Sequence, residues 1–247
     1  MDNKKLITKY NELRNMIILA NRKKQILKEQ ESSVNYIDLL GDSIGIYNGF
    51  IDENTSVVVG GTTKNLKSFK TGNLDEVYSD LINKVKINDI NNEEDLINKL
   101  KIVYDIVIKY FGYGDVNKRI NYYDYNDNVT LESLKSKNLA VCLEDATLSQ
   151  NMLKLLGINS TLKVSLVQYE DGRYDTHAYN LISYNNKYYL FDSRFPHNNN
   201  PVVREFKENE YLCFMSGTDE TMNIKECSNN IIYYACNIPL KKVSQKK

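Results

Sequence analysis

Apolar residues recur at helical spacing along several parts of the chain. Residues 4–30 carry apolar side chains on one side of a predicted amphipathic helix, and two further helices are predicted near 74–87 and 93–111. Segment 142–156 has apolar residues over too wide a face for a surface helix, which predicts a buried central helix. Gly157 follows its last periodic residue, as is typical where a left-handed glycine ends a helix.

Apolar and polar residues alternate after this helix, which is typical of strands that bury one face. Strands are predicted over 161–169, 177–184 and 187–192, as consecutive antiparallel neighbours. An additional short strand is predicted at 56–59, and a polar, aromatic loop at 121–128. Weaker strand patterns occupy 202–206, 211–215 and 231–236. Helices combined with antiparallel strands predict an α+β fold.

The predicted hairpin between 177–184 and 187–192 fixes which side chains share a face. Asn185 and Asn186 tolerate positive φ, so they predict a two-residue loop in which Tyr179 lies opposite Asp192. His177 is on the same face as Tyr179, diagonal to Asp192 at about 7 Å between Cβ atoms or less. A loop with an odd number of residues would turn Asp192 to the opposite face.

Cys142 is predicted to begin the central helix. The helix dipole and a neighbouring His177 imidazolium favour a thiolate there. Glu144 and Asp145 oppose it, but a first-turn carboxylate contributes only about 0.3–1 kcal/mol at an exposed site, so contact with His177 is expected to dominate. The N–H of Cys142 is a natural donor to an oxyanion. Candidates for a second oxyanion donor are Tyr122, Tyr123, Tyr125 and Gln150.

Composition narrows the possible functions. Lys plus Arg and Asp plus Glu both number 32, and this zero net charge disfavours binding to nucleic acid or to an anionic membrane. The apolar run 16–20 is too short to cross a membrane, so we expect a cytoplasmic protein. His177 is one of two histidines, and His197 would replace it if the hairpin register were odd. The four cysteines, at positions 142, 213, 227 and 236, lack the clustering of a metal site.

Residues 93–195 resemble the core of the transglutaminase-like superfamily. The similarity rests on four segments: Val141–Ala146, Leu155–Ser160, Thr176–Asn180 and Tyr188–Asp192. The resemblance implies a papain-like α+β core, in which a helix that carries a nucleophilic cysteine packs on an antiparallel sheet that carries histidine and aspartate.

The resemblance also implies residue roles. Cys142 matches the nucleophile, His177 the general base and acid, and Asp192 the acid that orients the histidine. The implied activity is acyl transfer from amide bonds of a protein or peptide substrate, as a peptidase, amidase, deamidase or transglutaminase, without a cofactor. Ala140 stands where the family often has Gly, and Ser193 where it often has Pro or Thr. Nothing in the sequence matches the calcium sites of animal transglutaminases.

Two other functions compete with this one. The chain could be a catalytically inactive scaffold or interaction protein that keeps the fold. It could also be an acyltransferase of the arylamine N-acetyltransferase type, which shares Cys-x-Glu and a similar spacing of His to Asp but usually has Arg-Gly-Gly before the cysteine. Under all three readings we expect an N-terminal helical extension over 1–70 and a catalytic-type domain over 71–247.

Overall fold

The computed structural model describes residues 36–37, 45–60, 67–85, 90–196, 199–216, 223–225 and 231–234. The predicted helix at 4–30 and the alternative histidine, His197, lie outside these residues. The described elements combine helices with a largely antiparallel sheet, which confirms the α+β class.

The larger sheet of the described residues has seven strands and is antiparallel throughout. Its order is β10 (Asn223–Lys225), β11 (Ile232–Tyr234), β6 (Asn159–Gln168), β7 (Tyr174–Tyr184), β8 (Lys187–Phe191) and β9 (Val202–Phe206), with β2 (Gly45–Tyr47) also paired with β6. The three central strands β6, β7 and β8 are those that the alternation of apolar residues predicts.

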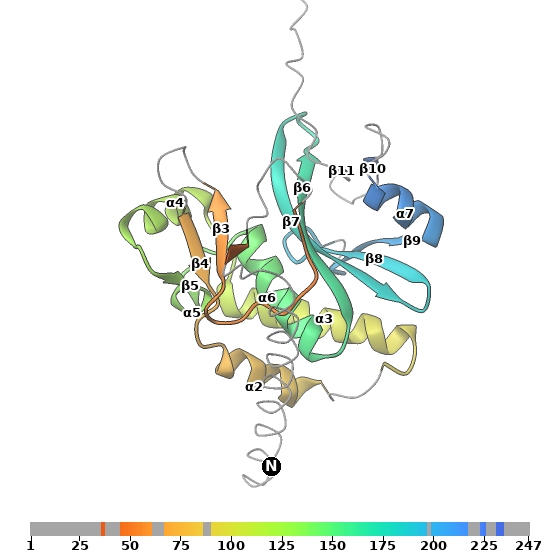
Figure 1. Cartoon of the computed structure of the whole chain (residues 1–247), viewed down its shortest axis with the longest axis horizontal. Coiled ribbons are helices and arrows are strands. Elements are labelled where there is room, and N and C mark those ends of the chain that lie inside the picture. The colour runs from red at the N-terminus through yellow and green to blue at the C-terminus, as the bar shows by residue number, and fades with distance from the viewer. Residues whose placement is uncertain are drawn as a thin grey trace, which may run out of the picture.

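A second sheet of four strands lies on the other side of the molecule (Figure 1). Its order is β1 (Tyr36–Ile37), β3 (Ser56–Gly60), β4 (Lys67–Lys70) and β5 (Val129–Thr130). Strand β3 confirms the predicted strand at 56–59. Strands β2 and β4 both pair with strands later in the chain, so described parts of residues 1–70 contribute to both sheets. The division at residue 70 stays a prediction.

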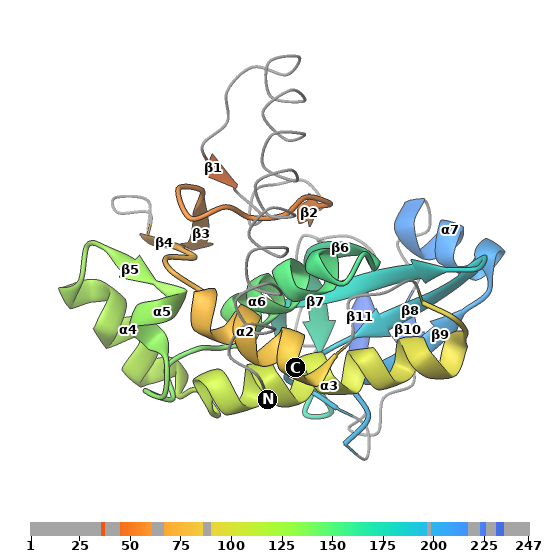
Figure 2. The same ribbon diagram turned by 90° about the horizontal axis from the view of Figure 1, so that it is seen from below.

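Six helices occur in the described residues: α2 (Asp75–Lys84), α3 (Glu93–Phe111), α4 (Val116–Tyr125), α5 (Leu131–Leu134), α6 (Cys142–Leu155) and α7 (Glu208–Ser216). Helix α6 contacts β6 and β7 on one side and the long helix α3 on the other. Figures 1 and 2 show α6 between the larger sheet and α3. The position of α2 and α3 confirms the two helices that the sequence predicts there.

Helix α6 is the buried central helix that the sequence predicts. All side chains from Leu143 to Leu153 are buried. Gly157 has φ +72°, and the N–H of Ile158 donates to the carbonyl of Leu153 at 2.9 Å. Ile158 is itself buried, so the glycine turn returns the chain onto the helix it ends.

Two local predictions are wrong. The predicted loop at 121–128 is largely helix α4, because Asp115 caps the helix by accepting from the N–H of Lys118 at 3.0 Å and Tyr123 is buried. The predicted strand at 211–215 is part of α7, in which Tyr211 and Phe214 lie on one helical side and both contact Phe206. In both segments the tertiary contacts of aromatic residues decide the structure, and a local alternation pattern does not reveal them.

Candidate active site

Cys142 is the first residue of α6 and is half-buried. The preceding residue, Val141, has an extended backbone, and its N–H donates to Oε2 of Glu144 at 3.1 Å. The N–H of Asp145 donates to the carbonyl of Val141 at 3.0 Å and closes the first turn. The thiol therefore lies at the positive end of the helix dipole, as the sequence predicts, and it is partly accessible.

The hairpin between β7 and β8 brings His177 and Asp192 together. Asn185 and Asn186 have φ of 48° and 60°, and Tyr184 pairs with Lys187 across the two-residue loop. In this register Nε2 of His177 lies 2.6 Å from Oδ2 of Asp192. The side chains are 2% and 1% exposed. The predicted even register is thus the observed one.

Asp192 is held from several directions. Tyr233 on β11 donates its hydroxyl to Oδ2 at 2.6 Å, while the N–H groups of Arg194 and Phe195 donate to Oδ1 at 2.8 and 3.3 Å. Burial alone would raise the pKa of Asp192, but the charge and hydrogen bond of His177, together with these donors, lower it below its usual value. The carboxylate is therefore charged at neutral pH.

His177 interacts with both of the other predicted site residues. Burial alone would lower its pKa, but the charges of Asp192 and Cys142 and hydrogen bonds to both side chains raise it to about 10. Since Nε2 faces Asp192, Nδ1 is the ring nitrogen left for the thiol. At neutral pH this raised pKa keeps the His177 imidazole protonated, between the Asp192 carboxylate and the Cys142 side chain.

Aromatic rings surround the imidazole. The ring of Phe195 is 4.8 Å from that of His177, and those of Tyr233 and Tyr179 are at 6.0 and 6.3 Å. These rings limit rotation of the imidazole and keep water from its hydrogen bond with Asp192. Phe195 also lines a pocket of about 520 Å³.

Glu144 lies on the opposite side of the start of α6 and is fully buried. Its Oε1 accepts from Nε of Arg119 at 2.8 Å and from the hydroxyl of Tyr123 at 2.7 Å, and it lies 2.7 Å from Nη2 of Arg119. Arg119 thus balances the charge of a carboxylate that would otherwise disfavour a thiolate at Cys142.

Asp145 forms a third buried network with Arg194. Nη2 of Arg194 lies 2.6 Å from Oδ2 of Asp145 and donates to the carbonyl of Ala140 at 2.6 Å. Within the described residues the oxygens of Asp145 accept no hydrogen bond. Burial therefore outweighs the attraction of Arg194 and raises the pKa of Asp145 to about 8. Arg194 links the turn after Asp192 to the segment before Cys142.

The predicted candidates for a second oxyanion donor have other contacts. Tyr123 donates to Glu144, and Nε2 of Gln150 donates to the carbonyls of Gly49 and Ser160. Tyr123 and Gln150 therefore have structural roles.

The hydroxyl of Tyr122 accepts from Lys137, and Tyr125 is 89% exposed. The N–H of Cys142, in the first turn of α6, stays the natural donor.

Sequence reasoning missed Tyr233, Arg194 and Arg119. Tyr233 is 41 residues from Asp192 and reaches it because β11 pairs with β6, which no local pattern reveals. Arg119 lies in the segment predicted to precede a loop, and its contact with Glu144 spans 25 residues. One signal was available for Arg194, because it lies only two residues after Asp192.

The described residues contain no group of three or more histidine, cysteine or acidic side chains that could hold a metal ion. None of their helices combines the length and the apolar composition needed to cross a lipid bilayer. The sequence matches no protein-family model, and a search of curated proteins finds no match. Any functional conclusion therefore depends on the geometry of the site.

Proposed function

We propose that this protein is a cysteine-nucleophile acyl-transfer enzyme that acts on amide bonds of a protein or peptide, with a papain-like, transglutaminase-like core. The observation that carries the proposal is His177, whose Nε2 lies 2.6 Å from Asp192 while Cys142 interacts with the same imidazole. A helix beginning with the cysteine and packed on a sheet with the other two residues also agrees with such a core.

The first half-reaction forms a thioester. The thiolate of Cys142 attacks the amide carbonyl carbon, and the electrons of the C=O bond move to oxygen, where the N–H of Cys142 stabilises the negative charge. When the tetrahedral intermediate collapses, the C–N bond breaks and the leaving amine takes a proton from the His177 imidazolium. Asp192 keeps the ring oriented and stabilises its positive charge.

The second half-reaction restores the enzyme. Neutral His177 accepts a proton from the attacking group, which adds to the thioester carbonyl, and the C–S bond then breaks to release the Cys142 thiolate. Water as the attacking group gives a peptidase, amidase or deamidase, and an amine gives a crosslinking enzyme. The three residues support both outcomes equally.

The charged groups argue against an inactive scaffold. Burying Asp192 and His177 has a desolvation penalty, and well-packed apolar residues of the same volume are often neutral or stabilising. A scaffold therefore has no structural need for this pair beside an accessible thiol. For an N-acetyltransferase-type reaction, we find no supporting observation.

The test compares wild type with Cys142→Ala in a cell lysate. New peptide termini, released ammonia and new crosslinks are measured by mass spectrometry, and we expect at least one of them to require Cys142. His177→Ala should remove the same product. If no product depends on either residue, the proposal is wrong and the scaffold interpretation is favoured.

A further inference from the structure

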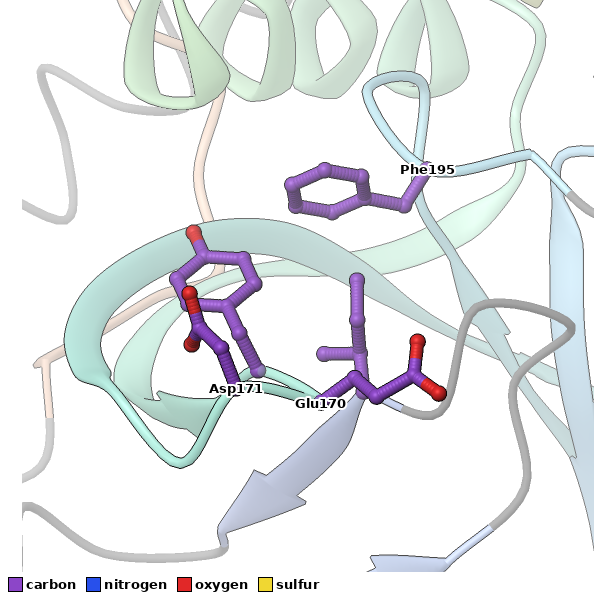
Figure 3. A pocket seen from close by; sticks show the side chains of 5 residues that line it. Glu170, Asp171 and Phe195 are labelled. Atoms are coloured by element: carbon purple, nitrogen blue, oxygen red, sulfur yellow. The ribbon is translucent and has the colours of Figure 1, made fainter.

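A pocket of about 520 Å³ lies beside the predicted triad. It is lined by Tyr169, Glu170, Asp171, Phe195 and Ile231. Figure 3 shows Phe195 across the pocket from Glu170 and Asp171. Phe195 lines this pocket and its ring is 4.8 Å from that of His177, so one wall of the pocket packs directly on the imidazole.

One wall of the pocket is aromatic. The ring of Tyr169 packs edge to face on Phe195, with 6.0 Å between centroids. Burial, followed by the negative charges of Asp175, Cys142 and Asp192, raises the pKa of Tyr169 to about 12. Tyr169 is therefore neutral at physiological pH and lies among negative charges, which is a setting that attracts a cation to its ring.

The rim across from Phe195 is acidic (Figure 3). The turn between β6 and β7 carries Glu170 and Asp171, and Asp175 follows in β7, whereas Arg173 is the one basic residue of the turn. Glu170 and Asp171 are exposed and line the pocket. An apolar wall facing two carboxylates matches a ligand with an apolar stem and a positively charged end.

Arg173 demonstrates that the rim accommodates a guanidinium. Its Nε lies 2.5 Å from Oδ2 of Asp171, and its guanidinium carbon lies 5.6 Å from the centroid of the Tyr169 ring. The Arg173 side chain is 76% exposed. An exposed ion pair of this kind contributes little to stability, so a cation from a substrate can compete with it.

We propose that this pocket binds an arginine or lysine side chain of the peptide whose amide bond Cys142 attacks; this inference rests on the proposed function. The aliphatic stem packs against Phe195 and Ile231. The charged end reaches Glu170 and Asp171, in competition with Arg173.

The test uses two peptidyl chloromethyl ketones that differ only in arginine against citrulline, which has the same shape without the charge. Alkylation of Cys142 is followed by mass spectrometry, and the rate for the arginine probe is divided by the rate for the citrulline probe. We expect a ratio of about five, the upper range for exposed ion pairs. The ratio should fall towards one at about 1 M salt.

Two kinds of variant should change the arginine-to-citrulline rate ratio in opposite directions. Glu170→Gln and Asp171→Asn should lower the ratio, whereas Arg173→Gln should raise it because it removes the competing cation. Glu94→Gln, on α3, is a matched control that should leave the ratio unchanged. A ratio within a single variant does not depend on the intrinsic reactivity of its thiol, so general damage to the fold does not imitate these shifts.

Two failures can be told apart. If both probes label wild type much faster than His177→Ala but at equal rates, the pocket proposal is wrong and the proposed function stands. A citrulline probe that reacts faster also overturns the pocket proposal. If neither probe labels wild type faster than His177→Ala, both proposals are wrong.

Discussion

Asp192 and Glu144 are two buried carboxylates near the start of α6, and their interaction networks end at different groups. Glu144 is bound by Arg119, Tyr123 and the N–H of Val141, so its network ends inside the protein. Asp192 binds His177, and that network continues through the imidazole to the half-buried thiol of Cys142.

The difference teaches that burial and ion pairing do not by themselves indicate catalysis. Glu144 and Asp192 are equally buried, and both accept several hydrogen bonds. Of these two networks, only that of Asp192 reaches a half-buried thiol, that of Cys142. We therefore propose catalysis for the His177 side and a structural role for Glu144.

The largest expected effect is on turnover, which should distinguish the His177 side from the Glu144 side. Replacing His177 with Ala removes the proposed general acid and base and should lower turnover by about 10²–10⁴-fold. Glu144→Gln keeps an oxygen that accepts from Tyr123, and it should reduce turnover far less. Rates of formation of the Cys142-dependent product measure both. Equal losses in the two variants would contradict the assignment.

Stability tests the structural role of Glu144. Glu144→Ala leaves the largely buried Arg119 without its charge partner, and we expect unfolding to become easier by about 3–5 kcal/mol. Urea unfolding followed by circular dichroism measures this change. Glu144→Gln, which retains an acceptor, serves as the control and should lose less. A loss under about 1 kcal/mol in Glu144→Ala would mean that the network is not structural.

The pH dependence of stability is specific to the His177 side. The pKa of His177 is raised from 6.5 to about 10 in the folded protein, so its stabilisation is fully present below pH 6.5 and is lost as the pH rises towards 10. The difference in unfolding free energy between wild type and His177→Ala should follow that window. Asp145, whose raised pKa gives the same trend, is present in both proteins and cancels to first order.

A flat difference between pH 6 and 10 would contradict the ion pair between His177 and its neighbours. Glu144→Gln is the control here, because the difference between it and wild type should not follow the His177 window.

The smallest expected effect tests the hydrogen bond that Tyr233 donates to Asp192. Tyr233→Phe removes one hydrogen bond to Oδ2 but keeps the ring that packs on Tyr179, and it should cost about 1–3 kcal/mol. Because that bond helps to lower the pKa of Asp192, the acid limb of the pH–rate profile should move to higher pH. Tyr123→Phe is the matched control on the Glu144 side and should leave the acid limb in place.

Local sequence signals predicted the parts of the site that depend on neighbours in the chain. Asn185 and Asn186 determine the register that brings His177 to Asp192, and Gly157 marks the end of α6. Cys142 begins its helix where the periodic pattern begins. In each case backbone preferences over a few residues decide the structure.

Other parts depend on contacts between distant segments. Tyr233 reaches Asp192 only through the pairing of β11 with β6, and α4 is stabilised by the contact of Tyr123 with Glu144. The sequence also gave no basis for choosing among possible charge partners of Glu144. These features follow from tertiary packing, which overrides local patterns.

The alkylation of Cys142 by iodoacetamide, measured against pH in wild type and His177→Ala, tests the central claim most directly. If the thiol pairs with the imidazolium, the wild-type rate stays nearly constant down to about pH 5.5, whereas in His177→Ala it falls about tenfold per pH unit, like an ordinary thiol. Mass spectrometry separates Cys142 from the other three cysteines. Identical pH profiles in the two proteins would contradict an activated nucleophile.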